Sequence, residues 1–178
     1  MLKNFTGVIV IIAASFLLEG CGIMKNKKPY PCPQVLLLND AKKLVKFNTL
    51  RGNDITDILF ESEFQHFVGK CQYFQKNGNW NIDVGLKVQI IVERGAANKE
   101  GNINFTYFAA IPAFQPSPAG KKLFQVKGKF IDSKVRLLYQ DDLSMRIPVE
   151  SPNLGSKFEI ILGFQLSPEE LNFNRTQR

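Results

Sequence analysis

The most regular pattern in the chain is a run over residues 82–92 in which apolar and polar side chains alternate. Successive side chains of a β-strand point to opposite faces, so apolar residues at every second position line one face. The residues that do so here are Ile82, Val84, Leu86, Val88, Ile90 and Val92. The intervening positions are mostly polar, so the run predicts a strand with one buried face and one solvated face.

Residues 56–74 alternate as well, but the parity of their apolar positions changes midway. One parity contains Ile58, Phe60, Phe64 and Val68, and the other contains Phe67, Cys71 and Tyr73. Such a change predicts a β-bulge, and we place its bend at Gly69. Asn77–Gly78–Asn79 is typical of a hairpin turn. We therefore predict one long hairpin over residues 56–92 at the centre of the sheet.

Shorter strand-like runs occupy much of the remaining chain. They lie at residues 35–38, 103–111, 123–131, 134–139 and 158–166. The third and fourth runs predict a second hairpin around Asp132–Ser133. Residues 147–149 predict an edge strand, because Pro148 cannot donate a ladder hydrogen bond. Residues 42–47 are compatible with either a turn of helix or an irregular segment.

A short C-terminal helix is predicted from its starting residues. Ser167 fits the N-cap, Pro168 the first helical position, and Glu169 and Glu170 the next two. We expect this helix to end before Arg175 and to pack on the domain. Its apolar contacts are expected from Leu171 and Phe173.

Seven or eight strands with few helices predict an all-β fold, an antiparallel β-sandwich with a short C-terminal helix. The 15 phenylalanines of the chain suit such a core. A closed β-barrel with a ligand cavity is the alternative. The Cys–Trp–Cys order of immunoglobulin domains is absent, because Trp80 follows both Cys32 and Cys71.

The N-terminus has a different pattern, in which a basic start precedes an apolar run over residues 8–18. A membrane-spanning helix needs about 20 apolar residues, so the run is too short for one. Residues Leu17–Leu18–Glu19–Gly20–Cys21 resemble the lipobox of bacterial lipoproteins, except that Glu19 stands where a small or hydroxyl residue is usual. The resemblance implies a signal peptide over residues 1–20, cleavage before Cys21, and attachment of lipid, including palmitate, to that cysteine.

Lipid anchoring would divide the mature chain into a basic tether, residues 21–31, and one domain, residues 32–178. Gly22 follows the cysteine, whereas Asp there would resemble the inner-membrane retention signal. The expected location is therefore the outer membrane, facing the periplasm, with the membrane as a partner through the lipid on Cys21. A signal anchor or soluble secretion is the alternative.

The net charge of +7 limits the classes of partner. In an exported protein the anionic candidates are phospholipid head groups, lipopolysaccharide and cell-wall polymer, not nucleic acid. The lysines are scattered along the sequence, which favours a solvated basic surface. We expect an envelope protein or a cell-wall component as the further partner.

The cysteines predict a disulfide. Of the three cysteines, one is assigned to the lipid, which leaves Cys32 and Cys71. The compartment beyond the inner membrane is oxidising, so we predict that these two are bonded. The bond would fasten the start of the domain, which would otherwise fray, to the long hairpin. A pair of buried free thiols is the alternative.

No catalytic or cofactor motif is recognisable in the sequence. His66 is the single histidine, which argues against a zinc site or Ser–His–Asp catalysis, and no G-x-S-x-G motif is present. The pairs Asp141–Asp142 and Glu169–Glu170 are neighbours in sequence only, and Gly120–Lys121 lacks the upstream glycine of a phosphate loop. We therefore expect no catalytic residue, metal or cofactor.

The expected function is accordingly a non-catalytic interaction or structural role in the envelope. Binding of a hydrophobic small molecule or lipid in a phenylalanine-rich interior is the alternative, and hydrolysis of an envelope component comes third. An open apolar cavity of several hundred Å³ would favour binding, whereas a filled core would favour interaction.

Several segments of the domain resemble those of uncharacterised alphaproteobacterial lipoproteins. They include Cys32–Pro33–Gln34–Val35, Gly69–Lys70–Cys71–Gln72–Tyr73, Tyr107–Phe108–Ala109–Ala110–Ile111 and Gly163–Phe164–Gln165–Leu166–Ser167–Pro168. The resemblance extends over nearly the whole mature chain and implies an envelope lipoprotein. It implies no activity and assigns no catalytic residue.

Overall fold

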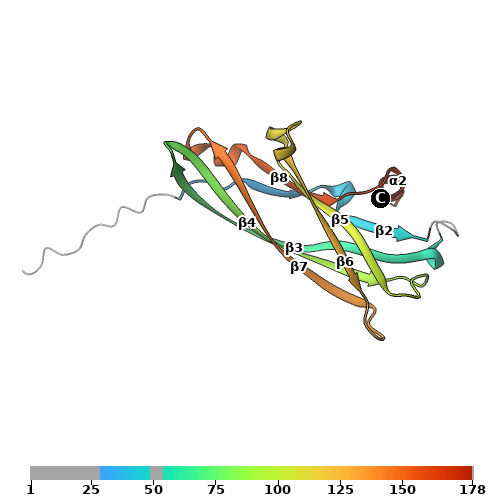
Figure 1. Cartoon of the computed structure of the whole chain (residues 1–178). Coiled ribbons are helices and arrows are strands. Elements are labelled where there is room, and N and C mark those ends of the chain that lie inside the picture. Colours follow the sequence, from blue (N-terminus) through green and yellow to red (C-terminus); the bar gives the residue numbers. More distant parts are fainter. Residues whose placement is uncertain (1–28, 49–53, 178) are drawn as a thin grey trace, which may run out of the picture.

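The computed structural model describes residues 29–48 and 54–177. These residues form two four-stranded β-sheets that face each other and are not closed into a barrel (Figure 1). Sheet A has the strand order β1–β8–β5–β6, and sheet B has the order β2–β3–β4–β7. Strand β1 runs parallel to β8, and the other described pairs are antiparallel. The predicted β-sandwich is confirmed.

The elements have the following bounds. Sheet A contains β1 (Gln34–Leu37), β8 (Glu159–Phe164), β5 (Asn102–Ala110) and β6 (Lys121–Lys129). Sheet B contains β2 (Lys43–Phe47), β3 (Ile58–Lys76), β4 (Asn79–Arg94) and β7 (Arg136–Val149). Short 3₁₀ turns are η1 (Asn39–Ala41), η2 (Ile55–Asp57), η3 (Pro112–Phe114), η4 (Pro118–Gly120) and η5 (Pro152–Lys157), and the α-helix is α2 (Pro168–Thr176).

The hydrophobic core fills the space between the sheets and is centred on β4. The alternating apolar side chains of β4 face sheet A, and Ile82, Val88 and Ile90 have no exposed surface. Tyr107 of sheet A has no exposed surface either, and Phe164 has almost none. Full burial of one large apolar side chain contributes about 1.5–3 kcal/mol. The predicted buried face of residues 82–92 therefore accounts for much of the attraction between the sheets.

The predicted long hairpin is confirmed as β3 and β4. Its turn contains Asn77 and Gly78, whose φ angles are 51° and 79°. Two consecutive positive φ values match the twist of the flanking strands, and asparagine followed by glycine is the pair that tolerates them best.

The bulge of β3 lies at Gln65, so its predicted position at Gly69 is wrong. The register with β4 shifts between Phe64 and His66, whereas Gly69 lies in regular register opposite Leu86. Gly69 serves packing instead, because a Cβ atom there would lie 2.9 Å from Cδ2 of Leu86. The change of parity therefore predicts correctly that β3 contains a bulge, but the glycine does not mark the position of that bulge.

The predicted second hairpin is also wrong. Strand β6 pairs with β5 in sheet A, and β7 pairs with β4 in sheet B. The segment around Asp132–Ser133 therefore crosses from one sheet to the other. Two alternating runs joined by a turn have the same local pattern whether they pair with each other or separate. Here each strand finds its partner elsewhere.

Two other segments have more regular structure than their patterns indicated. Residues 42–47 contain strand β2, which buries Leu44 and Val45 on opposite faces. The predicted edge strand at residues 147–149 is the end of β7, and β7 is an edge strand of sheet B.

Helix α2 begins as predicted. The Ser167 side chain accepts a hydrogen bond from the Glu170 N–H, and the Glu170 side chain accepts one from the Ser167 N–H. This capping box satisfies two N–H groups that the first helical turn leaves unpaired. The helix extends to Thr176, slightly beyond its predicted end.

Candidate functional site

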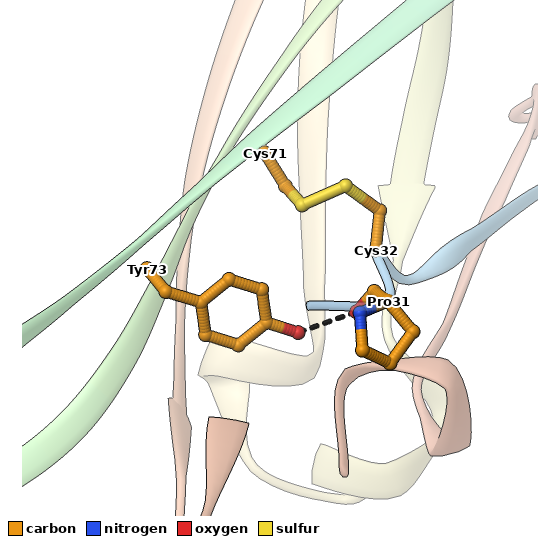
Figure 2. The surroundings of a disulfide bond; sticks show 4 residues. All are labelled: Pro31, Cys32, Cys71 and Tyr73. Carbon is orange, nitrogen blue, oxygen red and sulfur yellow. Dashed lines mark hydrogen bonds between the residues drawn. A yellow bond between two sulfur atoms is a disulfide. The ribbon is translucent and has the colours of Figure 1, made fainter. Parts of the chain in front are cut away.

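The first described residues, where the predicted tether would join the domain, lie at one end of the sandwich (Figure 1), and Figure 2 shows the disulfide beside them. Cys32 precedes β1 of sheet A and is bonded to Cys71 on β3 of sheet B, with the two Cα atoms 5.8 Å apart. The predicted disulfide is confirmed, and it joins the start of the domain to the opposite sheet. Cys21, the predicted lipid site, lies outside the described residues.

A hydrogen bond and close packing reinforce this junction. The Tyr73 hydroxyl donates to the Pro31 carbonyl, as Figure 2 shows. Burial raises the pKa of Tyr73, so the hydroxyl remains a donor at neutral pH. Gly155 of η5 lies against both groups, because a Cβ there would be 1.7 Å from the Tyr73 hydroxyl and 2.1 Å from the Pro31 oxygen. Tyr30 adds a ring contact with Tyr73, at 5.3 Å between centroids.

The sandwich carries an open groove beside α2, with a volume of about 790 Å³. Its apolar lining comes from β2, η2, β3 and α2. These residues are Val45, Phe47, Ile55, Ile58 and Phe173. Polar and charged residues at its margin are Asn39, Lys42, Lys43, Glu61, Asn174 and Gln177. The groove therefore combines an apolar floor with a mixed polar rim, which is the usual composition of a binding site.

Helix α2 forms one wall of the groove and is attached to the edge of β2. The Asn174 side-chain amide donates to the Lys43 carbonyl at 2.7 Å and to the Asp40 carbonyl at 2.9 Å. The Arg175 guanidinium pairs with the Asp40 carboxylate at 2.9 Å. The side chains of α2 thus pair with backbone carbonyls at and beside the edge of β2. Helix α2 is thereby attached to the strand whose residues line the groove.

Side-chain packing adds to that attachment. The rings of Phe47 and Phe173 meet edge to face with centroids 5.1 Å apart. In the first turn of the helix, Glu170 forms an ion pair with Lys46 of β2 at 2.9 Å. We expected apolar contacts from Leu171 and Phe173, and the ring of Phe173 makes one.

The groove and the tether junction occupy opposite ends of the domain. Ile58, the first residue of β3, lines the groove, and Tyr73 near the other end of the same 19-residue strand holds the junction. A strand rises about 3.3 Å per residue, so the path along β3 from Ile58 to Tyr73 is about 50 Å long. Figure 1 shows α2 and the first described residues at opposite ends of the sandwich.

The candidate catalytic groups do not converge. His66 is exposed on β3 opposite Gln89. Ser167 and Glu170 cap α2, and the Ser167 hydroxyl donates to Glu169, which holds the pKa of that carboxyl below its usual value. Among residues 29–48 and 54–177, no three His, Cys, Asp or Glu side chains are grouped so as to hold a metal ion.

Asp141 and Asp142 have separate surroundings. The Asp141 carboxylate reaches across the open side of the sandwich and accepts hydrogen bonds from the hydroxyls of Tyr107, at 2.6 Å, and Tyr139, at 3.2 Å. Burial, with the nearby Asp141 charge, raises the pKa of both tyrosines. Asp142 is exposed and lies 3.8 Å from Lys87. This arrangement links β5 of sheet A to β7 of sheet B.

Sequence reasoning did not identify the groove. Two of its apolar residues, Val45 and Phe47, lie in the segment that was not predicted as a strand. The local signal was weak, because the apolar residues at positions 44, 45 and 47 do not alternate with polar ones. Lining residues that are far apart in the sequence, such as Val45 and Phe173, come together only when α2 packs against β2.

Comparisons with protein-family models, curated proteins and solved structures give no match to this chain. In the described part of the chain, no helix has the length and apolar character required to cross a membrane.

Proposed function

We propose that this chain is a lipid-anchored envelope lipoprotein whose β-sandwich is a non-catalytic interaction module. Residues 1–20 are its signal peptide, Cys21 bears the lipid, and residues 21–31 are the tether. The outer membrane, facing the periplasm, is its location. The proposal combines the N-terminal sequence with the placement of the groove.

The observation that carries the interaction role is the separation of groove and tether junction by about 50 Å along β3. The Cys32–Cys71 bond holds the start of the domain at the far end from α2. A domain anchored through that start would hold its groove away from the bilayer, where an envelope partner can reach it. The packed core agrees with an interaction surface rather than an internal ligand cavity.

Replacement of Cys21 tests the anchoring. We expect Cys21→Ser to abolish labelling with radioactive palmitate and to accumulate as the uncleaved precursor, because lipidation precedes cleavage at a lipobox cysteine. Cys32→Ser serves as the control, since it removes a thiol and leaves the lipobox intact. Palmitate labelling that is unchanged in Cys21→Ser would reject the assignment.

A second candidate function is the binding of a hydrophobic molecule, and the groove is the feature that favours it. The interior is filled by side chains such as Tyr107 and Ile160, neither of which has exposed surface. A hydrophobic ligand would therefore occupy the groove beside α2, whose floor is apolar, and its acidic group would meet Lys42 at the rim, since Lys43 is already paired with Glu61.

A fluorescent fatty acid tests this second candidate with the unlipidated chain that starts at residue 22. Ile55 lines the groove and is 76% exposed, so Ile55→Glu places a charge at the ligand without disturbing the core. We expect at least about tenfold weaker binding, a loss of roughly 1.4 kcal/mol. Val68→Glu is the matched control, because Val68 is 56% exposed and outside the groove. Absence of saturable binding to the wild-type chain would exclude this function.

A further inference from the structure

The sheet edges of this sandwich differ in how they are protected. An edge strand presents unpaired N–H and C=O groups and can pair with a strand from another chain. At the edge of sheet B formed by β2, the Lys43 carbonyl already accepts a hydrogen bond from Asn174 of α2. That edge is therefore occupied by the helix of the same chain.

The opposite edge of sheet B, formed by β7, is interrupted at two positions. The Arg94 N–H donates to the Val135 carbonyl, and the register of β4 with β7 is regular from there on. The odd-numbered residues of β7 therefore direct their backbone N–H and C=O groups toward β4. The even-numbered residues direct theirs to the open edge. Pro148 has no N–H to offer there, and the N–H of Asp142 is bonded to the Asp141 carboxylate at 2.9 Å.

Strand β6, at the edge of sheet A (Figure 1), has neither kind of protection. The Phe130 N–H donates to the Gly101 carbonyl, so the even-numbered residues of β6 bond to β5. The odd-numbered residues face the open edge, and all of them are exposed: Lys121, Leu123, Gln125, Lys127 and Lys129. Within the described residues, no hydrogen bond to the backbone N–H or C=O of these five comes from another element.

The charge on this edge has one sign. Four lysines lie on β6, and no Asp or Glu occurs between residues 101 and 131. Lys121 is held by Gln165 at 2.7 Å, whereas Lys127 and Lys129 form no ion pair among the described residues. A second copy paired along β6 would bring lysines against lysines, which is unfavourable. An acidic strand would instead bring carboxylates beside Lys127 and Lys129.

We propose that the β6 edge binds an extended, acidic polypeptide segment of another protein by strand addition. The backbone groups at residues 121, 123, 125, 127 and 129 supply the hydrogen bonds, and the lysines select alternating acidic side chains. This surface is separate from the groove beside α2, so the chain has a second binding site of different chemistry. The inference does not depend on the lipid anchor.

The test uses a fluorescein-labelled nine-residue peptide of alternating glutamate and valine, titrated into the mature, lipidated protein in nonionic detergent. The informative variant is Gln125→Pro. The N–H of Gln125 faces the open edge, so proline removes a donor for the incoming strand without breaking the β5–β6 ladder, as Pro148 does on β7. We expect binding to weaken at least tenfold in Gln125→Pro and to stay unchanged in the matched control Gln125→Ala.

Two further arms separate strand addition from general attraction of anions. Lys127→Glu with Lys129→Glu should weaken binding at least tenfold and give preference to a lysine–valine peptide. A glutamate–valine peptide that is N-methylated at alternate residues should bind at least tenfold more weakly to the wild-type protein, and this arm does not depend on how any variant folds.

Three results would overturn the proposal. The first is no binding of the glutamate–valine peptide to the wild-type protein. The second is binding that is lost in the lysine variant but retained in both Gln125→Pro and the N-methylated peptide, which would show a diffuse electrostatic contact. The third is lysine-dependent binding to vesicles containing anionic phospholipid with no peptide binding, which would assign β6 to a membrane surface.

Discussion

Replacement of both Cys32 and Cys71 by serine is expected to lower the free energy of unfolding by about 4 kcal/mol. The bond closes a loop with a sequence separation of 39 residues, and the chain-entropy relation gives about 4 kcal/mol for a loop of that length. A domain of this size has a total stability of about 5–15 kcal/mol, so the loss is a large fraction. Urea denaturation of the oxidised wild-type protein and of the double variant measures the difference.

Reduction provides the matched control for this prediction. Wild-type protein in excess reductant should reproduce the stability of the double variant, and reductant should leave the variant unchanged. The Tyr73–Pro31 hydrogen bond remains in both, so the chain start should loosen without releasing the whole sandwich. A loss below about 1 kcal/mol would show that the covalent link adds little to the contacts around Gly155.

Replacement of Asp141 by alanine is expected to lower the stability by about 2 kcal/mol. The Tyr107 side chain has no exposed surface, and Asp141 is the acceptor of its hydroxyl, so the variant removes the partner of a buried hydroxyl. A buried hydroxyl without a partner costs about 1–3 kcal/mol. The variant also frees the Asp142 N–H at the open edge of β7, and we expect it to self-associate more readily.

Two comparison variants identify the cause. Asp142→Ala should change the stability by less than about 0.5 kcal/mol, because its carboxylate is exposed and its ion pair is long. Tyr107→Phe in the Asp141→Ala background should recover part of the loss, since it removes the hydroxyl that lacks an acceptor. Equal effects of the two aspartate variants would show that the Asp141–tyrosine contacts contribute nothing specific.

Some features follow from short-range patterns and were predictable from the sequence. The alternation over residues 82–92 places all the apolar side chains on one face of a strand. That face must be buried, so the position of the strand in the core follows from the period of two. The Asn77–Gly78 turn and the Ser167 cap depend on backbone geometry within a few residues. The Cys32–Cys71 pairing was predictable once Cys21 was assigned to the proposed lipid and an oxidising compartment was expected.

Other features could not be predicted because they depend on the pairing of strands that are far apart in the sequence. The patterns of β6 and β7 allow a hairpin, but β7 gains a longer partner in β4 and β6 pairs with β5. The short β2 is hard to recognise because its buried residues, Leu44 and Val45, are adjacent and face opposite ways.

The sequence by itself therefore determined the all-β class, the central hairpin, the disulfide and the helix cap, since each arises from neighbouring residues or from elimination. Tertiary structure alone decided the sheet to which each strand belongs, the groove between β2 and α2, and the lysine-bearing edge of β6. Lys121, Lys127 and Lys129 share one face of β6 because successive side chains of a strand point alternately to its two faces. Whether that edge stays open depends on what folds beside it, and only the assembled sandwich settles this.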